Sequence, residues 1–203
     1  MTRIRYKIGI DEVGRGPLAG PVTVAAFLMP ASDKLPNNKR AKLRDSKKLS
    51  EKQRNEWDSY LRNNKKYNFA IVSFSPKKID KYNISKSANL CAQKALLKLS
   101  QKIKTKDLHK KAKIYLDGGL YVGEKGSNIG KTIIKGDEKI KVISAASILA
   151  KVYRDKLMNK YALKFAGFNF DLNKGYGTAH HIKILKRKGA TSIHRKTFIS
   201  NFV

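Results

Sequence analysis

The chain has 203 residues, of which 41% are hydrophobic, so it contains enough apolar material for a folded core and is not a disordered chain. Lys and Arg number 45 against 15 Asp and Glu, and the formal net charge is +30. This excess favours a polyanionic partner, because each phosphate that Lys or Arg neutralises releases condensed counterions. A lysine-rich, solvated surface is the alternative interpretation. No apolar run reaches the roughly 18 residues that span a bilayer.

The N-terminus lacks the apolar segment of a signal peptide, so we expect a cytoplasmic protein without a membrane partner. The single cysteine, Cys91, excludes an internal disulfide and lies in an apolar helical stretch. We predict that it is a small buried hydrophobic residue and not a nucleophile.

The first elements are two strands joined by a tight connection. Residues 4–12 alternate between apolar and polar and predict a strand with Asp11 and Glu12 at its end. Residues 14–21 contain three glycines and two prolines, which is typical of a turn. The apolar run 22–29 predicts a second, buried strand.

The middle of the chain begins with a polar and basic stretch, 30–50, which predicts a loop. Ser50 and Gln53 have the spacing of a capping box, so a helix begins there and continues to about residue 62. Residues 69–74 predict a strand, and the apolar periodicity of 85–103 predicts a helix.

The second half alternates again. Residues 113–118 and 131–137 predict strands that each end in an acid, 142–165 predicts a long apolar helix, and 178–188 predicts a basic helix before a basic tail. The order of elements indicates an α/β protein with a mixed sheet and helices packed on it.

Four acids stand at the ends of three predicted strands: Asp11, Glu12, Asp117 and Asp137. Chemistry gathers at strand ends, because rigid strands position side chains while loops leave room for a substrate. Clustered carboxylates repel one another unless a cation is present, and oxygen ligands suit Mg²⁺ or Mn²⁺. The alternative is that Asp117 and Asp137 only cap turns. Asp155, on the long helix, is the rival fourth acid, and we interpret it as part of a structural pair on the helix surface.

The histidines offer no zinc-ligand spacing. His180 and His181 are adjacent, while His109 and His194 are isolated in the sequence. We predict surface or capping roles for them. Two hard cations about 4 Å apart can clamp a phosphodiester, so the acids and the basic body together favour a metal-dependent nuclease.

Several segments, in order along the chain, resemble the ribonuclease HII family. They are Gly9–Val22 (GIDEVGRGPLAGPV), Asp45–Ser50 (DSKKLS), Tyr115–Gly118, Lys135–Asp137, Ile143–Val152 with Arg154 and Asp155, Gly175–Thr178 and His194–Phe198. The match spans nearly the whole chain. In two places the chain departs from the family pattern: Gly118–Leu120 stands where an asparagine and a basic residue are more usual, and 122–130 is glycine-rich and predicts a mobile loop.

The resemblance implies an RNase H-like fold with a central mixed sheet, in one domain over 1–203, of which about 166–203 is a basic helical C-terminal segment. It implies a divalent-metal endonuclease, with Mn²⁺ or Mg²⁺, that cuts the RNA strand of RNA–DNA hybrids and incises 5′ of ribonucleotides embedded in duplex DNA. The products carry 3′-hydroxyl and 5′-phosphate ends, which suits ribonucleotide excision repair. By position, Asp11, Glu12, Asp117 and Asp137 match the metal-site acids. We expect a monomer.

The same resemblance implies substrate contacts. Gly14, Arg15 and Gly16 match the element that approaches the ribose 2′-hydroxyl and a phosphate, Tyr176 matches a tyrosine that packs on a neighbouring sugar, and Lys47 is a further phosphate contact. Without the resemblance, a glycine turn and a packing tyrosine would be preferred.

Three other functions stay open. A basic nucleic-acid-binding module without catalysis would not need the strand-end acids. Another nuclease on the same fold, such as a DNA resolvase, would not need 2′-hydroxyl selection. Ribonuclease HIII would lack the arginine between the glycines and carry an extra N-terminal domain.

Overall fold

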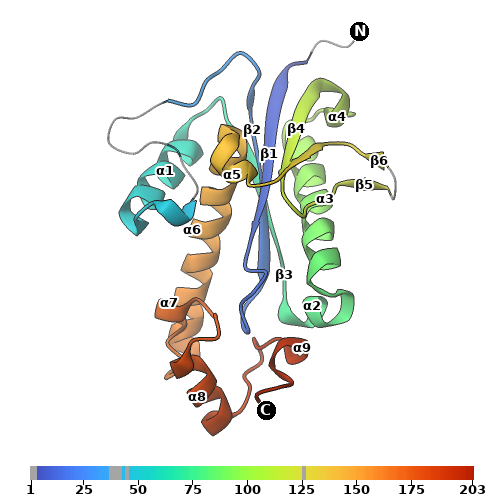
Figure 1. The fold of residues 1–203 in the computed structure, drawn as a ribbon. Helices are drawn as coiled ribbons and strands as arrows, with labels where there is room; N and C mark the ends of the chain where they lie inside the picture. Colours follow the sequence, from blue (N-terminus) through green and yellow to red (C-terminus); the bar gives the residue numbers. More distant parts are fainter. Residues whose placement is uncertain (1–3, 37–42, 44–45, 125–126) are drawn as a thin grey trace.

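The structure, a computed structural model, describes residues 4–36, 43, 46–124 and 127–203. Five strands form one mixed sheet with helices on both faces, which confirms the predicted fold class (Figure 1). The strands are β1 (Tyr6–Val13), β2 (Val22–Pro30), β3 (Asn68–Phe74), β4 (Ala112–Asp117) and β7 (Lys131–Ile133), in the order β3-β2-β1-β4-β7. β1, β2 and β3 pair antiparallel, whereas β4 pairs parallel with both β1 and β7.

The helices lie on both faces of the sheet and at one end of it (Figure 1). They are η1 (Ser46–Lys48), α1 (Glu51–Asn63), α2 (Pro76–Tyr82), α3 (Ile84–Lys102), α4 (Leu108–Lys111), α5 (Gly136–Lys139), α6 (Lys141–Lys164), α7 (Phe170–Asn173), α8 (Ala179–Lys188) and α9 (Lys196–Ile199). α3 covers one face of the sheet, α6 and α1 cover the other, and α7 to α9 gather at the C-terminal end of α6 (Figure 1).

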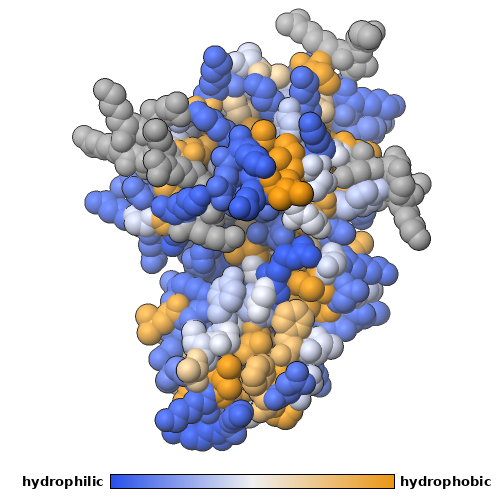
Figure 2. Space-filling view, viewed as in Figure 1, coloured by the Kyte–Doolittle hydropathy of each residue, from blue (hydrophilic) through white to orange (hydrophobic). Residues whose placement is uncertain are grey.

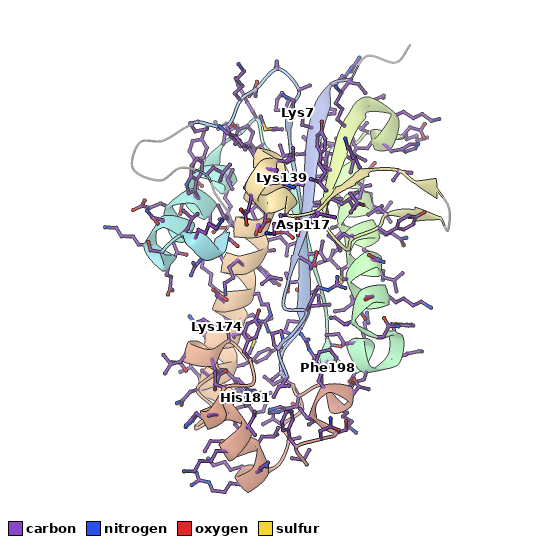
Figure 3. The ribbon with its side chains drawn as sticks, in the orientation of Figure 1. Lys7, Asp117, Lys139, Lys174, His181 and Phe198 are labelled. Atoms are coloured by element: carbon purple, nitrogen blue, oxygen red, sulfur yellow. The ribbon has the colours of Figure 1, made fainter. Side chains whose placement is uncertain are left out.

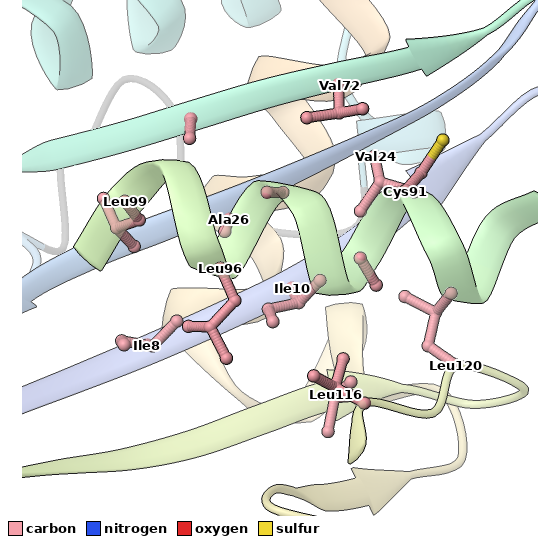
Figure 4. Close-up of a cluster of buried hydrophobic side chains, with 14 of the residues drawn as sticks. Ile8, Ile10, Val24, Ala26, Val72, Cys91, Leu96, Leu99, Leu116 and Leu120 are labelled. Atoms are coloured by element: carbon pink, nitrogen blue, oxygen red, sulfur yellow. The ribbon is translucent and has the colours of Figure 1, made fainter. Parts of the chain in front are cut away.

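The alternation of β1 divides the core into two layers. Ile8 and Ile10 point toward α3, where Cys91 and Leu99 are fully buried as the sequence predicts for the cysteine (Figure 4). Gly9 points the other way, toward the start of α6. β1 therefore packs against α3 on one face and against α6 on the other, and both helices restrict its position.

Local sequence patterns are confirmed where they are strong. The capping box at the start of α1 is formed, with the Gln53 backbone N–H donating to Ser50 Oγ at 3.2 Å and the Ser50 N–H donating to Gln53 Oε1 at 2.9 Å. The short helices α2, α4, α7 and α9 were not predicted. The segment 122–130 contains the short paired strands β5 (Gly123–Glu124) and β6 (Ser127–Asn128), and its mobility stays a prediction.

The predicted strand over 131–137 is wrong in its second half. β7 ends at Ile133, Lys135 adopts a left-handed backbone (φ 54°), and α5 begins at Gly136. Asp137 therefore lies in the first turn of a short helix and not at a strand end.

The predicted surface roles of two histidines are also wrong. His181 and His194 are 0% and 4% exposed, and they pack among Phe168 and Phe170 in the core of the C-terminal helices. Their burial is a tertiary effect, because α8 and the segment before α9 close on the end of α6.

The face of the molecule drawn in Figure 2 is mainly polar. Figure 2 shows hydrophilic side chains over most of this face, with smaller hydrophobic areas between them. In the part of the chain that the structure describes, no helix is both long and apolar enough to cross a membrane.

We predict that Gly9→Ala destabilises the protein by about 3 kcal/mol, because the added methyl would lie 2.1 Å from backbone atoms of Val142. Urea unfolding of both proteins measures this change. Gly16→Ala is the matched control, since its methyl would meet nothing closer than 3.8 Å and should change stability by less than about 1 kcal/mol. Equal effects of the two substitutions would contradict the packing argument.

Candidate active site

A pocket of about 400 Å³ lies at the ends of β1 and β4 and collects residues from six parts of the chain. Its lining includes most of the residues singled out in the sequence: Asp11, Glu12, Gly14, Arg15, Gly16, Asp117, Asp137 and Tyr176. Figure 3 places Asp117 near the centre of the molecule, close to α5. The side chain of Lys47 lies outside the described part of the structure, although its backbone forms η1.

Parallel pairing of β1 with β4 brings the first three acids together. Ile10 pairs with Leu116, so the next residues, Asp11 and Asp117, are neighbours at the end of the two strands. Among the described residues, Asp11, Glu12 and Asp117 form a group whose ligand oxygens all lie within 4.8 Å of one another. This is the convergence that a divalent-cation site requires.

Asp11 and Glu12 reach this group from opposite faces of β1. The parity of the strand places Asp11 on the α6 side, where Ser147 hydrogen-bonds to it, and Glu12 on the α3 side. The register with β2 runs unbroken from Tyr6 to Val13, so no bulge turns the second acid. The two carboxylates meet because the strand ends there and leaves the space beyond it open.

Asp137 reaches the pocket from the first turn of α5. The Gly136 N–H donates to Asp117 Oδ1 at 2.6 Å, and Ser144 Oγ donates to the Asp137 carbonyl at 2.6 Å. These bonds join the short helix to β4 and to α6. Asp137 lines the wall of the pocket without joining the three-acid group of the described residues.

The three-acid group is electrostatically strained. Burial raises the pKa of Asp11 well above its usual range, and the charges of Glu12 and Asp117 raise it further, against hydrogen bonds from Ser147 and the Glu12 N–H (2.7 Å). Burial likewise raises the pKa of Glu12 to about 7, although the Arg15 guanidinium, 3.3 Å away, lowers it. A cation would relieve this strain, because it favours the charged carboxylates.

One atom in particular fits a cation. Glu12 Oε2 is buried and, within the described residues, has no hydrogen-bond partner. A buried acceptor without a donor costs about 1–3 kcal/mol, and a hard divalent ion takes oxygen ligands of this kind. The residues that would hold such an ion are Asp11, Glu12 and Asp117, with Asp137 beside them.

Arg195 is one of two fully buried arginines among the described residues, and it holds the glycine-rich connection that forms part of the pocket wall. Its guanidinium donates to the carbonyls of Gly14 (2.6 Å), Arg15 (2.8 Å) and Gly20 (3.0 Å), and burial lowers its pKa to about 9. Gly14 has φ +89°, and a methyl there would lie 2.4 Å from Arg154. The glycine is therefore required by both backbone angle and space.

The second buried arginine, Arg154, joins this connection to the segment that carries Tyr176. It donates to the carbonyls of Ala19 (3.2 Å), Pro21 (3.0 Å) and Lys174 (2.9 Å). The sequence did not single out either arginine for this role, because an arginine whose partners are distant carbonyls has no local pattern. The only signal was its occurrence within segments that carry the resemblance.

Arg15 does not point freely into the pocket. Its Nη1 pairs with Glu12 Oε1 at 3.3 Å, and its Nη2 donates to Ser85 Oγ at 3.1 Å at the start of α3. Tyr176 is 44% exposed, and it is the nearest side chain to the space beside Gly16. The glycine-rich connection and the segment of the tyrosine thus lie side by side, and together they form one wall of the pocket.

The loop before α1 reaches the site through η1. Ser46 Oγ and Ser147 Oγ lie 2.9 Å apart, and Lys48 pairs with Glu138 of α5 at 2.9 Å. Ser147 hydrogen-bonds to Asp11 and a carboxylate only accepts, so Ser46 must donate to Ser147. Ser46 and Ser147 line the pocket, and the sequence did not single them out.

Asp155, the rival fourth acid, binds Lys151 at 2.8 Å on the same helix and is 9% exposed. The predicted structural pair is therefore confirmed, and the partner of Asp155 is Lys151. Asp155 is largely buried, whereas the sequence predicted a pair on the helix surface. It does not appear in the three-acid group or in the lining of the pocket.

Comparison with known proteins agrees with this geometry. The family model for ribonuclease HII matches residues 8–201. The chain belongs to the ribonuclease HII family. A ribonuclease HII of Pelagibacter ubique is 42% identical over 94% of this chain and 94% of its own length, and one of Clostridium perfringens is 38% identical over 98% of this chain and 68% of its own length. The ribonuclease H2 of Pyrococcus horikoshii has a similar structure, with a TM-score of 0.70 at 26% identity over 95% of this chain and 93% of that one.

As a ribonuclease HII family member, the protein is a ribonuclease H endonuclease that acts on RNA–DNA hybrids. The reading as a non-catalytic binding module is therefore excluded. A Bst ribonuclease HIII shares the fold at 18% identity (TM-score 0.69), but the matching family is ribonuclease HII, as the Gly-Arg-Gly element indicates.

We predict that Mg²⁺ or Mn²⁺ stabilises the protein against heat, by about 2.7 kcal/mol at a hundred times the dissociation constant. The affinity should rise as pH increases through about 7, because the ion displaces the proton that the raised pKa of Glu12 retains below that pH. Calorimetric titration at several pH values measures this dependence. Asp11→Asn should abolish the stabilisation, while Asp171→Asn on α7 should keep it; equal stabilisation of both variants would refute the site.

Proposed function

We propose that the enzyme hydrolyses the RNA strand of RNA–DNA hybrids and incises 5′ of ribonucleotides embedded in duplex DNA, by two-metal-ion hydrolysis. The observation that carries the proposal is the group of Asp11, Glu12 and Asp117 at the ends of paired strands, in a pocket walled by Gly14–Gly16 and Tyr176. The same pocket thus contains acids that can bind cations and a wall that can contact a ribose. This combination favours ribonucleotide incision over the cleavage of pure DNA by a resolvase.

The acids are the proposed cation ligands. Asp11, Glu12 and Asp117 bind from the ends of β1 and β4, and Asp137 from α5. When bound, Mg²⁺ or Mn²⁺ supplies activation of the attacking water and stabilisation of the leaving oxygen. Water adds to phosphorus, the bond from phosphorus to the 3′ oxygen breaks, and the proton lost by water is balanced by one gained at that oxygen. The products are a 3′-hydroxyl and a 5′-phosphate.

The glycine-rich connection is the proposed reader of the 2′-hydroxyl. Arg195 fixes the carbonyls of Gly14 and Arg15, so the backbone presented to the ribose is rigid before substrate binds. Arg15 would exchange Glu12 and Ser85 for a substrate phosphate once a cation neutralises the acids. Tyr176 packs on the neighbouring sugar, and Lys47 binds a backbone phosphate.

The surface suits a nucleic-acid duplex. The net charge of +30 contrasts with the acidic pocket, and α8 exposes Lys183, Lys186 and Arg187 while it buries Ile184 and Leu185. Basic side chains attract the phosphate backbone, and the acids act only at the scissile bond. Incision at embedded ribonucleotides gives the protein a role in ribonucleotide excision repair, and we propose that it acts as a monomer.

We predict that the protein cuts a labelled duplex with one ribonucleotide in Mg²⁺ or Mn²⁺, at the 5′ side of that ribonucleotide, and is inactive with EDTA. Asp11→Asn and Asp137→Asn should each lose about 1,000-fold or more in rate while they bind the duplex nearly as before. Gel analysis of the products gives rate and cut position together.

Two further variants act as controls in the same assay. Asp155→Asn tests the rival fourth acid and should retain far more activity than Asp137→Asn, because Asp155 does not line the pocket and is joined to it only through its ion pair with Lys151. Asp171→Asn should be unchanged. Full turnover by Asp11→Asn, or cleavage of an all-DNA duplex at the same rate, would refute the proposal.

We predict that affinity for a hybrid duplex falls by about 100-fold or more between about 50 and about 200 mM salt, because phosphate binding releases counterions. Fluorescence anisotropy with the inactive Asp11→Asn variant measures binding without cleavage. An affinity that is independent of salt would show that the basic surface does not contact the backbone.

A further inference from the structure

Two buried histidines lie directly behind the segment that carries Tyr176. His181 on α8 and His194 before α9 face each other with 2.9 Å between their Nε2 atoms, and both are enclosed by the rings of Phe168 and Phe170. Figure 3 shows His181 in the C-terminal part, away from Asp117. The proposed chemistry uses neither histidine.

The hydrogen bonds fix the position of each proton. The Thr191 N–H donates to His194 Nδ1 at 2.9 Å, so that nitrogen is the acceptor and the His194 proton is on Nε2. His194 Nε2 therefore donates to His181 Nε2. The remaining proton of His181 is on Nδ1, which donates to the Tyr176 carbonyl at 2.8 Å. Two neutral rings in defined tautomers thus connect Thr191 with Tyr176.

The pair is built to remain neutral. Burial lowers the pKa of both rings, and for His194 it lowers the pKa to about 4 with a further contribution from His181. An added proton on His181 Nε2 would face the N–H of His194 Nε2, and one on His194 Nδ1 would face the Thr191 N–H, so either would break a hydrogen bond.

Tyr176 depends on its backbone for its direction. Its side chain is 44% exposed, so packing alone does not hold the ring. The backbone is held on both sides: the Tyr176 N–H donates to the Asn173 carbonyl at 2.9 Å, and its own carbonyl accepts from the Thr178 N–H at 2.9 Å and, as its side-chain donor, from His181. Arg154 holds the Lys174 carbonyl two residues earlier.

We propose that His181 and His194 are positioning residues, which fix the Tyr176 backbone so that its ring meets the sugar next to the ribonucleotide. The inference rests on the proposed function, because it assigns Tyr176 to the substrate. It predicts that loss of the hydrogen bonds of His181 slows cleavage only because Tyr176 is displaced. The other groups of the site should be unaffected.

The test is a double-mutant cycle on the single-ribonucleotide duplex. His181→Phe keeps an aromatic ring among Phe168 and Phe170 but removes both hydrogen bonds, and we expect kcat/KM to fall about 10-fold. In a Tyr176→Ala background the same substitution should cause no further loss. The amide N–H of His181→Asn can replace the Nδ1 donor. This variant should therefore recover most of the activity that His181→Phe loses. Thermal melting establishes that each variant is folded.

A second measurement does not depend on activity or on variants. Imidazole ¹⁵N spectra of the unaltered protein at neutral pH should show one proton on His181 Nδ1 and one on His194 Nε2. The opposite tautomers, or a charged ring, would overturn the inference. So would an equal loss from His181→Phe with and without Tyr176, or a folded His181→Phe variant with full activity. Failure of the unaltered enzyme to cut at the ribonucleotide would instead refute the proposed function, and this inference with it.

Discussion

The parallel pairing of β1 with β4 is the constraint on which the rest of the structure depends. It places Asp11 beside Asp117 at the point where both strands end, and Glu12 follows from the next position on β1. Each acid is held by the main chain of a central strand, so the carboxylates cannot move apart to relieve their repulsion. Burial is the main cause that raises the pKa of Asp11 and of Glu12, and the charges of neighbouring acids raise both further; a bound cation would offset both effects.

The pocket is acidic, whereas the chain as a whole is strongly positive. The positive charge favours affinity for a duplex, and the acids serve the chemistry. A chain of net charge +30 attracts a polyanionic duplex, but three carboxylates within 4.8 Å of one another would repel the scissile phosphate. Arg15 offsets part of this charge through Glu12. Cation binding would both neutralise the acids and release Arg15, so that the site becomes competent for a phosphate only when its metal is present.

The sequence predicts the features whose cause is local. Ser50 and Gln53 form their capping box, and the alternation before Asp11 forms β1, because both patterns act over a few residues. The strand predicted over 131–137 is wrong in its second half, because the chain turns at Lys135 with a left-handed backbone. A glycine usually marks such a turn in a sequence, and this position has a lysine. The burial of His181 and His194 fails for another reason: their pairing depends on how α8 closes on α6, which no spacing encodes.

Three buried polar side chains, one on α6 and two in the C-terminal part, donate to main-chain carbonyls of two adjacent segments that line the pocket. Arg195 and Arg154 hold the connection after β1, and Arg154 with His181 holds the segment of Tyr176. Burying two guanidinium groups costs desolvation energy, and the same carbonyls would otherwise be solvated. That cost is reasonable if rigidity is needed, because a ribose that differs from deoxyribose by one hydroxyl is distinguished only by a wall that does not yield. Under the proposed function, the C-terminal helices would contribute to the selectivity of the pocket as well as to the fold.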